Sequence, residues 1–160
     1  MMVNKILDLN LLKDKVEKLK LKNKIVLTNG CFDLLHVGHI RYLREAARLG
    51  DILIIAVNSD QSVRELKGSN RPLLPLEERM ELLAALDFVD FVTSFSTETC
   101  SPVIELIQPD LYVKGGDYSP ETLPEWDLIK KYGGNVEFIE MTTERSTSGI
   151  IDKIISSHKK

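Results

Sequence analysis

Short apolar segments alternate with amphipathic ones along the whole chain, and this alternation restricts the fold more than any other feature of the sequence. The apolar segments are rich in Val, Ile and aromatic residues, and they cover residues 24–28, 51–57, 88–93, 110–113 and 136–139. Such short segments are typical of buried strands. Strands that alternate with helices form βαβ units, whose parallel sheet is covered on both faces. The sequence therefore predicts an α/β fold with a doubly wound, five-stranded parallel sheet.

Amphipathic patterns between these segments predict the helices. Ile40, Leu43 and Ala47 recur at helical spacing before Gly50, a residue type that commonly ends a helix. Similar patterns predict further helices near residues 12–19, 76–83, 103–107 and 150–155.

Length and composition restrict the possible functions. A chain of 160 residues suits one domain, in which we expect a helical extension at 1–22 and a core at 23–157. The 21 Lys and Arg residues against 24 Asp and Glu give a formal net charge of −3, unlike the basic surface of a nucleic-acid-binding protein. No apolar run approaches a membrane span, and residues 1–12 are too polar for a signal peptide. We therefore expect a cytoplasmic protein without nucleic-acid or membrane partners.

The carboxyl ends of the predicted strands are where functional residues are expected. In open α/β sheets, ligands bind beyond these ends, where the loops leave the sheet. The site should therefore be built from the residues that follow Leu27, Val57, Val92, Val113 and Ile139.

The loop after the first predicted strand carries two histidines at the start of a helix. His36 and His39 project from one side of the first turn, and Gly38 between them lets a ligand approach the backbone. A helix start offers unpaired N–H groups, and imidazoles there can donate hydrogen bonds to phosphoryl oxygens. A lone histidine in this place is usually a cap or a packed side chain, whereas the pair after a buried strand indicates a phosphate site. Structural zinc is not expected, because Cys31 is the only other Cys or His nearby.

The pattern Gly30-x-Phe32-Asp33-x-x-His36-x-Gly38-His39 resembles the signature of the cytidylyltransferase-like nucleotidyltransferases, which share His-x-Gly-His with class I aminoacyl-tRNA synthetases. Two further segments match in order. Residues 114–118 follow the fourth predicted strand, and Ser146-Thr147-Ser148 open the last predicted helix. The resemblance implies a Rossmann-like fold and nucleotidyl transfer.

A narrower resemblance, over about residues 10–156, is to the adenylyltransferases of ADP-heptose synthesis. It rests on residues 28–33, 57–60, 66–68, 71–72, 78–79 and 113–118. In many bacteria this activity is the C-terminal half of a bifunctional heptose kinase/adenylyltransferase, and the chain resembles a stand-alone form. The resemblance implies transfer of AMP from ATP to D-glycero-β-D-manno-heptose 1-phosphate, which gives ADP-heptose and pyrophosphate for lipopolysaccharide core or related heptose glycoconjugates. It also implies a homodimer.

Residue roles follow from this resemblance together with the chemistry of phosphate groups. The expected catalytic residues are His36, His39 and Lys114. The expected nucleotide-binding residues are Thr28, Asn29, Gly30, Cys31, Phe32, His36, Gly38, His39, Lys67, Gly116, Asp117, Ser146, Thr147 and Ser148. The residues expected at the acceptor phosphate or sugar are Asp33, Asn58, Asp60, Arg71, Arg79 and Lys114. Mg²⁺ is expected with ATP, held mainly by phosphates and water, without a dedicated protein site.

Several of these residues also have plain structural interpretations. Ser146–Ser148 and Asp60 suit helix caps, Asp117 suits a turn, and Asp33 suits a residue that orders its loop or orients His36. Most Lys and Arg side chains are solvated surface charges, and both cysteines suit small buried residues.

The sequence departs from the family pattern at three places. Cys31 stands where cytidylyltransferases usually have Thr or Ser, Arg145 is out of register with their arginine, and residues 121–126 do not match closely. This last segment could border the acceptor site. Two alternatives therefore stay open: a cytidylyltransferase acting on glycerol 3-phosphate or another polyol phosphate, and a non-catalytic nucleotide-binding regulatory domain.

Overall fold

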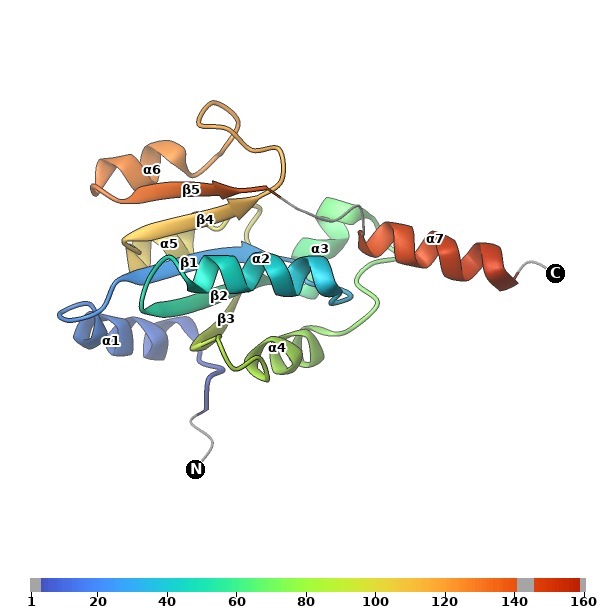
Figure 1. The fold of residues 1–160 in the computed structure, drawn as a ribbon, viewed down its shortest axis with the longest axis horizontal. Coiled ribbons are helices and arrows are strands. Elements are labelled where there is room, and N and C mark those ends of the chain that lie inside the picture. Colours follow the sequence, from blue (N-terminus) through green and yellow to red (C-terminus); the bar gives the residue numbers. More distant parts are fainter. Residues whose placement is uncertain (1–3, 141–145, 159–160) are drawn as a thin grey trace.

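A five-stranded parallel sheet forms the centre of the molecule in a computed structural model that describes residues 4–140 and 146–158 (Figure 1). The sheet order is β3-β2-β1-β4-β5. The strands are β1 (Ile25–Gly30), β2 (Ile52–Asn58), β3 (Phe91–Phe95), β4 (Leu111–Gly115) and β5 (Asn135–Ile139). The order reverses between β1 and β4, so that the loops after these two strands diverge and leave a crevice at their carboxyl ends. The predicted fold class is confirmed.

Seven helices are described around the sheet. They are α1 (Leu9–Leu19), α2 (Val37–Ala47), α3 (Asp60–Lys67), α4 (Leu76–Ala84), α5 (Ser101–Ile107), α6 (Trp126–Lys131) and α7 (Thr147–His158). The amphipathic pattern does not single out α3, whose only buried apolar residue is Val63, or α6, which is barely more than one turn long. None of the described helices has the length and hydrophobicity that crossing a bilayer requires.

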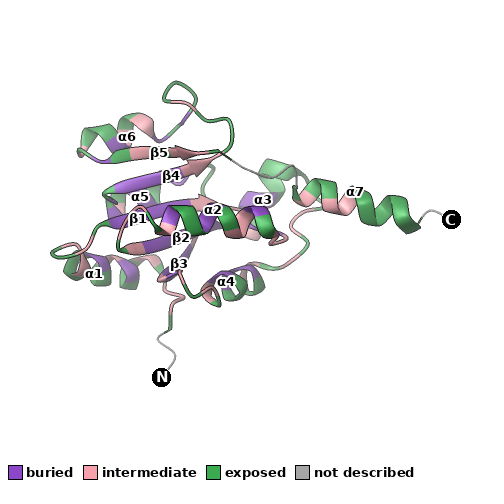
Figure 2. Cartoon of the chain, viewed as in Figure 1, coloured by how far each residue is buried: buried purple, intermediate pink, exposed green. Residues whose placement is uncertain are grey.

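Two hydrophobic clusters pack on opposite faces of the sheet. Side chains alternate along β1, where Ile25 and Leu27 belong to one cluster and Val26 to the other. The first cluster includes Leu12 and Val16 of α1, so this N-terminal helix is part of the core packing. The buried strands and the inward faces of most helices stand out in Figure 2, whereas α7 buries no residue.

Gly50 follows α2 for a reason of packing. A side chain at this position would approach the carbonyl oxygen of Lys24 to 2.8 Å and a methyl group of Val26 to 2.5 Å. Neither distance is tolerated, so Gly50 allows the turn after α2 to lie directly against the start of β1.

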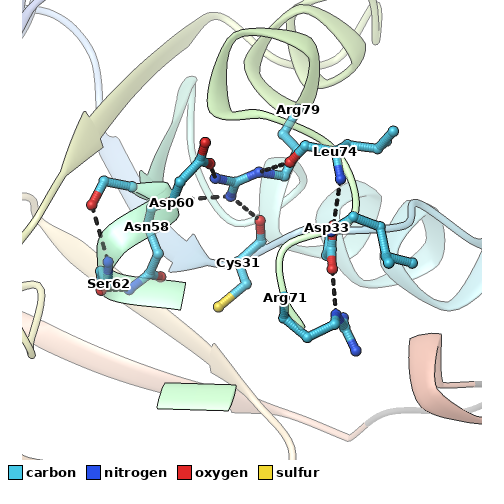
Figure 3. Close-up of polar contacts among 10 residues, drawn as sticks. Cys31, Asp33, Asn58, Asp60, Ser62, Arg71, Leu74 and Arg79 are labelled. Atoms are coloured by element: carbon cyan, nitrogen blue, oxygen red, sulfur yellow. Dashed lines mark hydrogen bonds and ion pairs between the residues drawn. The ribbon is translucent and has the colours of Figure 1, made fainter. Parts of the chain in front are cut away.

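A buried guanidinium connects the carboxyl ends of β1 and β2 to α3 and α4 (Figure 3). Arg79 of α4 is fully buried, and its Nε donates to the carbonyl of Leu74 at 3.0 Å. Its Nη1 donates to the carbonyls of Cys31 at 2.6 Å and Asn58 at 2.8 Å, and its Nη2 donates to the Asp60 carboxylate at 2.6 Å. The planar fork of arginine donors suits this arrangement, which a lysine could not reproduce. Arg79 therefore stabilises the loops at this edge of the sheet.

Replacing Arg79 with methionine is expected to lower the free energy of unfolding by about 3–5 kcal/mol, because the change leaves the Asp60 carboxylate and the buried carbonyls without their donor. Urea denaturation of the wild type and the variant measures the difference. Arg64→Met on the exposed face of α3 is the control and should have little effect. Equal losses in the two variants would contradict the role of Arg79.

Candidate active site

A cavity of about 200 Å³ opens at the carboxyl ends of β1 and β4. This first cavity is lined by Asn29, Gly30, Cys31, Phe32, Asp33, His39, Tyr42, Lys67, Lys114, Gly115, Gly116 and Thr147. Ten of these residues are predicted site residues, so the structure brings together segments that are far apart in the sequence. Tyr42 and Gly115 were not predicted. Tyr42 lies on the buried face of α2, where its position in the sequence indicates only packing.

The two histidines stack at the start of α2. The imidazole of His36 caps the helix, because its Nδ1 accepts a hydrogen bond from the Gly38 N–H at 3.1 Å. The rings of His36 and His39 lie 3.9 Å apart between centroids, and the Phe32 ring meets His39 edge-on at 5.5 Å. Since Nδ1 of His36 is an acceptor, its neutral ring carries the proton on Nε2. Helix geometry and aromatic packing thus fix both rings.

His39 is held in its neutral form. Burial, followed by the charges of His36 and Lys67, lowers its pKa from 6.5 to about 4, although the Leu34 carbonyl opposes this shift. A neutral imidazole is still a hydrogen-bond donor. His39 can therefore donate a hydrogen bond to an anion in the first cavity while its ring stays uncharged.

Lys114 is a partly buried cation fixed by a short network. Its Nζ donates to Oδ1 of Asn29 at 3.1 Å, and the same oxygen accepts a hydrogen bond from the Tyr112 hydroxyl at 2.6 Å. The ammonium lies 4.7 Å from the centroid of the Tyr118 ring. Burial lowers the pKa of Lys114, while the carboxylate of Glu125 opposes the shift. An anion bound beside Lys114 would favour its charged form.

Asp33 orders the loop that carries Arg71 rather than presenting a free carboxylate (Figure 3). Its oxygens accept hydrogen bonds from the N–H groups of Leu73 at 2.7 Å and Leu74 at 3.1 Å, and they form an ion pair with Nε of Arg71. Burial alone would raise the pKa of Asp33, but the hydrogen bonds from Leu74, Arg71 and Leu73 outweigh it and lower the pKa. Nη2 of Arg71 is buried and has no hydrogen-bond partner among the described residues, and Arg71 is not among the residues that line the first cavity.

Three predicted binding residues have structural partners instead. Thr28 is fully buried and is not among the residues that line the first cavity, although its hydroxyl forms a hydrogen bond at 2.6 Å with the hydroxyl of Tyr42, which does line it. The guanidinium of Arg79 is buried among the carbonyls and the Asp60 carboxylate described above. These contacts do not support the expectations that Thr28 touches the nucleotide or that Arg79 and Asp60 touch the acceptor.

The start of α7 lies beside the histidine loop. The hydroxyl of Thr147 donates to the Leu34 carbonyl at 3.3 Å and lines the first cavity. The hydroxyl of Ser146 accepts a hydrogen bond from the Gly149 N–H at 3.0 Å and so caps the helix, as its plain interpretation predicts. Ser148 and Asp117 are exposed, Gly38 is buried in the first turn of α2, and Arg145 lies outside the described residues.

A second cavity of about 400 Å³ adjoins the first. The two share Asn29, Gly30, Cys31, Lys67 and Lys114. The other residues that line the second cavity are Asn58, Leu66, Glu98, Thr99, Tyr118, Pro124 and Glu125. Asn58 is one of the residues expected at the acceptor, and Glu125 lies in the segment 121–126 that could border the acceptor site, whereas nothing in the sequence singled out Glu98. No group of three or more His, Cys, Asp or Glu side chains in the described ranges could hold a metal ion.

Comparisons with known proteins agree with this geometry. The family described as Cytidylyltransferase-like matches residues 27–158. The "Bifunctional protein HldE" of Syntrophotalea carbinolica is 48% identical over 149 residues, which cover 92% of this chain and 30% of that protein. The protein of the same name from Citrifermentans bemidjiense is 53% identical over 135 residues, which cover 84% of this chain and 28% of that protein. The chain thus spans less than a third of the length of these curated relatives.

Two solved structures share the fold. The lipopolysaccharide core biosynthesis protein from Thermoplasma volcanium superposes with a TM-score of 0.62 at 28% identity, over 77% of this chain and 99% of that one. Pantoate-beta-alanine ligase from Francisella tularensis gives a TM-score of 0.63 at 18% identity, over 90% of this chain and 69% of that one, and supports the fold alone. Since the family match runs from the last residues of β1 through the stacked histidines to α7, the chain belongs to the cytidylyltransferase-like family of nucleotidyltransferases.

Proposed function

We propose that the chain transfers AMP from ATP to D-glycero-β-D-manno-heptose 1-phosphate, which gives ADP-heptose and pyrophosphate for lipopolysaccharide core or related heptose glycoconjugates. The observation that carries the proposal is the pair of adjoining cavities, which share Lys67 and Lys114 and have His39 on the wall of the first. The choice of ATP and heptose rests on the resemblance to adenylyltransferases of ADP-heptose synthesis and on the close similarity to proteins named HldE.

The reaction needs positioning and charge stabilisation more than covalent chemistry. An oxygen of the acceptor phosphate attacks the α-phosphorus of ATP, the bond from that phosphorus to the bridging oxygen breaks, and pyrophosphate leaves with the negative charge. Neutral His39 donates a hydrogen bond to the α-phosphate or the bridging oxygen, and His36 holds the ring of His39 by stacking. Lys67 and Lys114, at the wall common to both cavities, attract the two phosphates to one place.

The remaining contacts are assigned by position. Thr147 and the N–H groups at the start of α7 are placed to bind the β- and γ-phosphates. Lys67 and Lys114 are the stronger candidates for the acceptor phosphate, since neither Arg71 nor Arg79 is among the residues that line the two cavities. Mg²⁺ would be held by phosphate oxygens and water, since the carboxylate that lines the first cavity, Asp33, already accepts three hydrogen bonds. The need for ATP as donor supports a cytoplasmic location.

A homodimer in which α7 meets a second copy of the chain is also proposed. This helix stands away from the sheet in Figure 1 and exposes Ile154 and Ile155 by half or more of their surface. A helix of this length gains most of its stability from packing an apolar face, which α7 does not do within one chain. Light scattering of the wild type should give twice the mass of one chain, and the Ile154→Glu variant should give the mass of a single chain. A wild-type monomer at all concentrations would contradict the dimer.

Pyrophosphate release tests the proposed reaction directly. The purified protein is assayed with ATP or CTP against a panel of sugar and polyol phosphates, and turnover should be fastest with ATP and the heptose 1-phosphate. Activity with CTP and glycerol 3-phosphate alone would instead identify a polyol-phosphate cytidylyltransferase. Binding of ATP without turnover on any acceptor would indicate a regulatory domain.

Replacing His39 with alanine should lower turnover by at least about 100-fold, the scale of losing one donor to developing charge in a transition state. His158→Ala, near the far end of α7, removes the same ring outside the site and should leave the rate unchanged. Circular dichroism confirms that both variants fold. Normal turnover of a folded His39 variant would contradict the role assigned to His39.

Replacing Lys67 with glutamine should raise the pKa of His39 above about 4, because the charge of Lys67 is one of the causes that lower it. An NMR titration of the imidazole signals measures the shift, with Lys153→Gln on α7 as the control. The depressed pKa also means that the folded protein binds fewer protons than the unfolded chain between pH 6.5 and 4, so this contribution to stability is lost as the pH falls through that range. An unchanged or lower pKa in Lys67→Gln would contradict the electrostatic origin of the shift.

A further inference from the structure

The second cavity is lined by charges of both signs. Lys67 and Lys114 lie on the wall shared with the first cavity, whereas Glu98 and Glu125 line the part that the first cavity does not reach. A sugar phosphate has a matching polarity, with an anionic phosphate at one end and hydroxyl groups at the other. The carboxylates would repel a phosphate and accept hydrogen bonds from hydroxyls, so the charges favour one orientation of such a ligand.

Glu125 is the most enclosed of these charged groups. Only 4% of its surface is exposed, and its Oε1 accepts a hydrogen bond from the Cys100 N–H at 3.0 Å, where α5 begins. An ionised carboxylate offers about four acceptor positions, and this is the one hydrogen bond found to the carboxylate of Glu125 among the described residues. Burying a charge is costly unless polar partners compensate for it. Capping α5 does not require this charge, because an uncharged amide oxygen could accept the same bond.

The position of Glu125 in the sequence points the same way. It belongs to residues 121–126, the segment that departs from the pattern of the resembled family, and its neighbour Pro124 also lines the second cavity. Residues that carry the family resemblance line the first cavity and also much of the second, among them Asn58, Lys67 and Tyr118. Within the second cavity, the departing segment contributes the part of the wall formed by Pro124 and Glu125.

We propose that the second cavity holds the sugar of the acceptor and that Glu125 determines specificity by accepting hydrogen bonds from its hydroxyl groups. This inference rests on the proposed function, since it names the residue that recognises the acceptor of that reaction. The phosphate of the acceptor lies at Lys67 and Lys114, where an oxygen can reach the α-phosphorus of ATP in the first cavity. Glu125 then selects acceptors with hydroxyl groups on the side away from the phosphate.

The substitution Glu125→Gln tests the assignment, because glutamine keeps the size of the side chain and an oxygen for the Cys100 N–H. The KM for heptose 1-phosphate should rise about 10- to 100-fold, the scale of losing a hydrogen bond to a charged group. The KM for ATP and kcat at saturating acceptor should stay unchanged. Inorganic phosphate competes for the phosphate position but has no sugar, so its inhibition constant should be the same for the wild type and the variant. Glu105→Gln, the same change at an exposed position of α5, is the matched control.

Each outcome decides between the possible roles of Glu125. A selective rise in the KM for the sugar phosphate supports the assignment. Unchanged kinetics overturn it, and so does an equal weakening of ATP, phosphate and sugar phosphate with a lower melting temperature, because that result shows a structural residue. A wild type that uses no sugar phosphate overturns the proposed function itself, whereas an active wild type with an indifferent variant overturns the role of Glu125 alone.

Discussion

The buried guanidinium of Arg79 is the interaction on which the geometry of the site depends. Its donors bind carbonyls at the ends of β1 and β2, the loop before α4, and the carboxylate at the start of α3. These segments leave the sheet in different directions, and their carbonyls would otherwise be buried without partners. Since the histidine loop begins at Cys31, whose carbonyl is one of these acceptors, Arg79 also fixes where that loop starts. A single side chain thus does here what a structural metal does in other loop-rich sites.

The electrostatics above this foundation are arranged for an incoming anion. Burial and neighbouring positive charge keep His39 neutral, and a network through Asn29 to the Tyr112 hydroxyl holds Lys114 in place. Donors that are already oriented need little reorganisation when a phosphate binds and its charge moves to the leaving group. Asp33 does not reduce this positive field much, because its charge is paired with Arg71 and solvated by two backbone amides. The crevice is therefore cationic, although the net charge of the whole chain is −3.

The sequence predicted the sheet well because strand composition and alternation are local signals. It predicted much of the first cavity for a similar reason, since the carboxyl ends of parallel strands converge whatever their loops contain. The expectations that the geometry does not support depended on side-chain direction. Thr28 lies next to Asn29 in the same motif, yet alternation along β1 directs its hydroxyl to that of Tyr42. Arg79 was expected at the acceptor phosphate, and only the packing of α4 shows that it is enclosed. Glu125 carries no motif, so its burial could not be predicted from the chain, although the departure of residues 121–126 from the family pattern already suggested that this segment borders the acceptor site.

The arrangement of the two cavities separates nucleotide chemistry from acceptor choice. In-line transfer requires the acceptor oxygen to approach the α-phosphorus opposite the leaving pyrophosphate, and in the proposed reaction the wall with two lysines that both cavities share brings the two substrates together there. In the proposed function, the histidines and the start of α7 would determine how the nucleotide lies, whatever the acceptor. Gly116, at the start of the loop between β4 and α6, lines the first cavity, whereas Tyr118 and Glu125 farther along this loop line the second. The part of the loop after Gly116 can therefore differ without disturbing the residues around the first cavity. A change in this loop would therefore alter which phosphate ester receives the nucleotide while the transfer step stays the same.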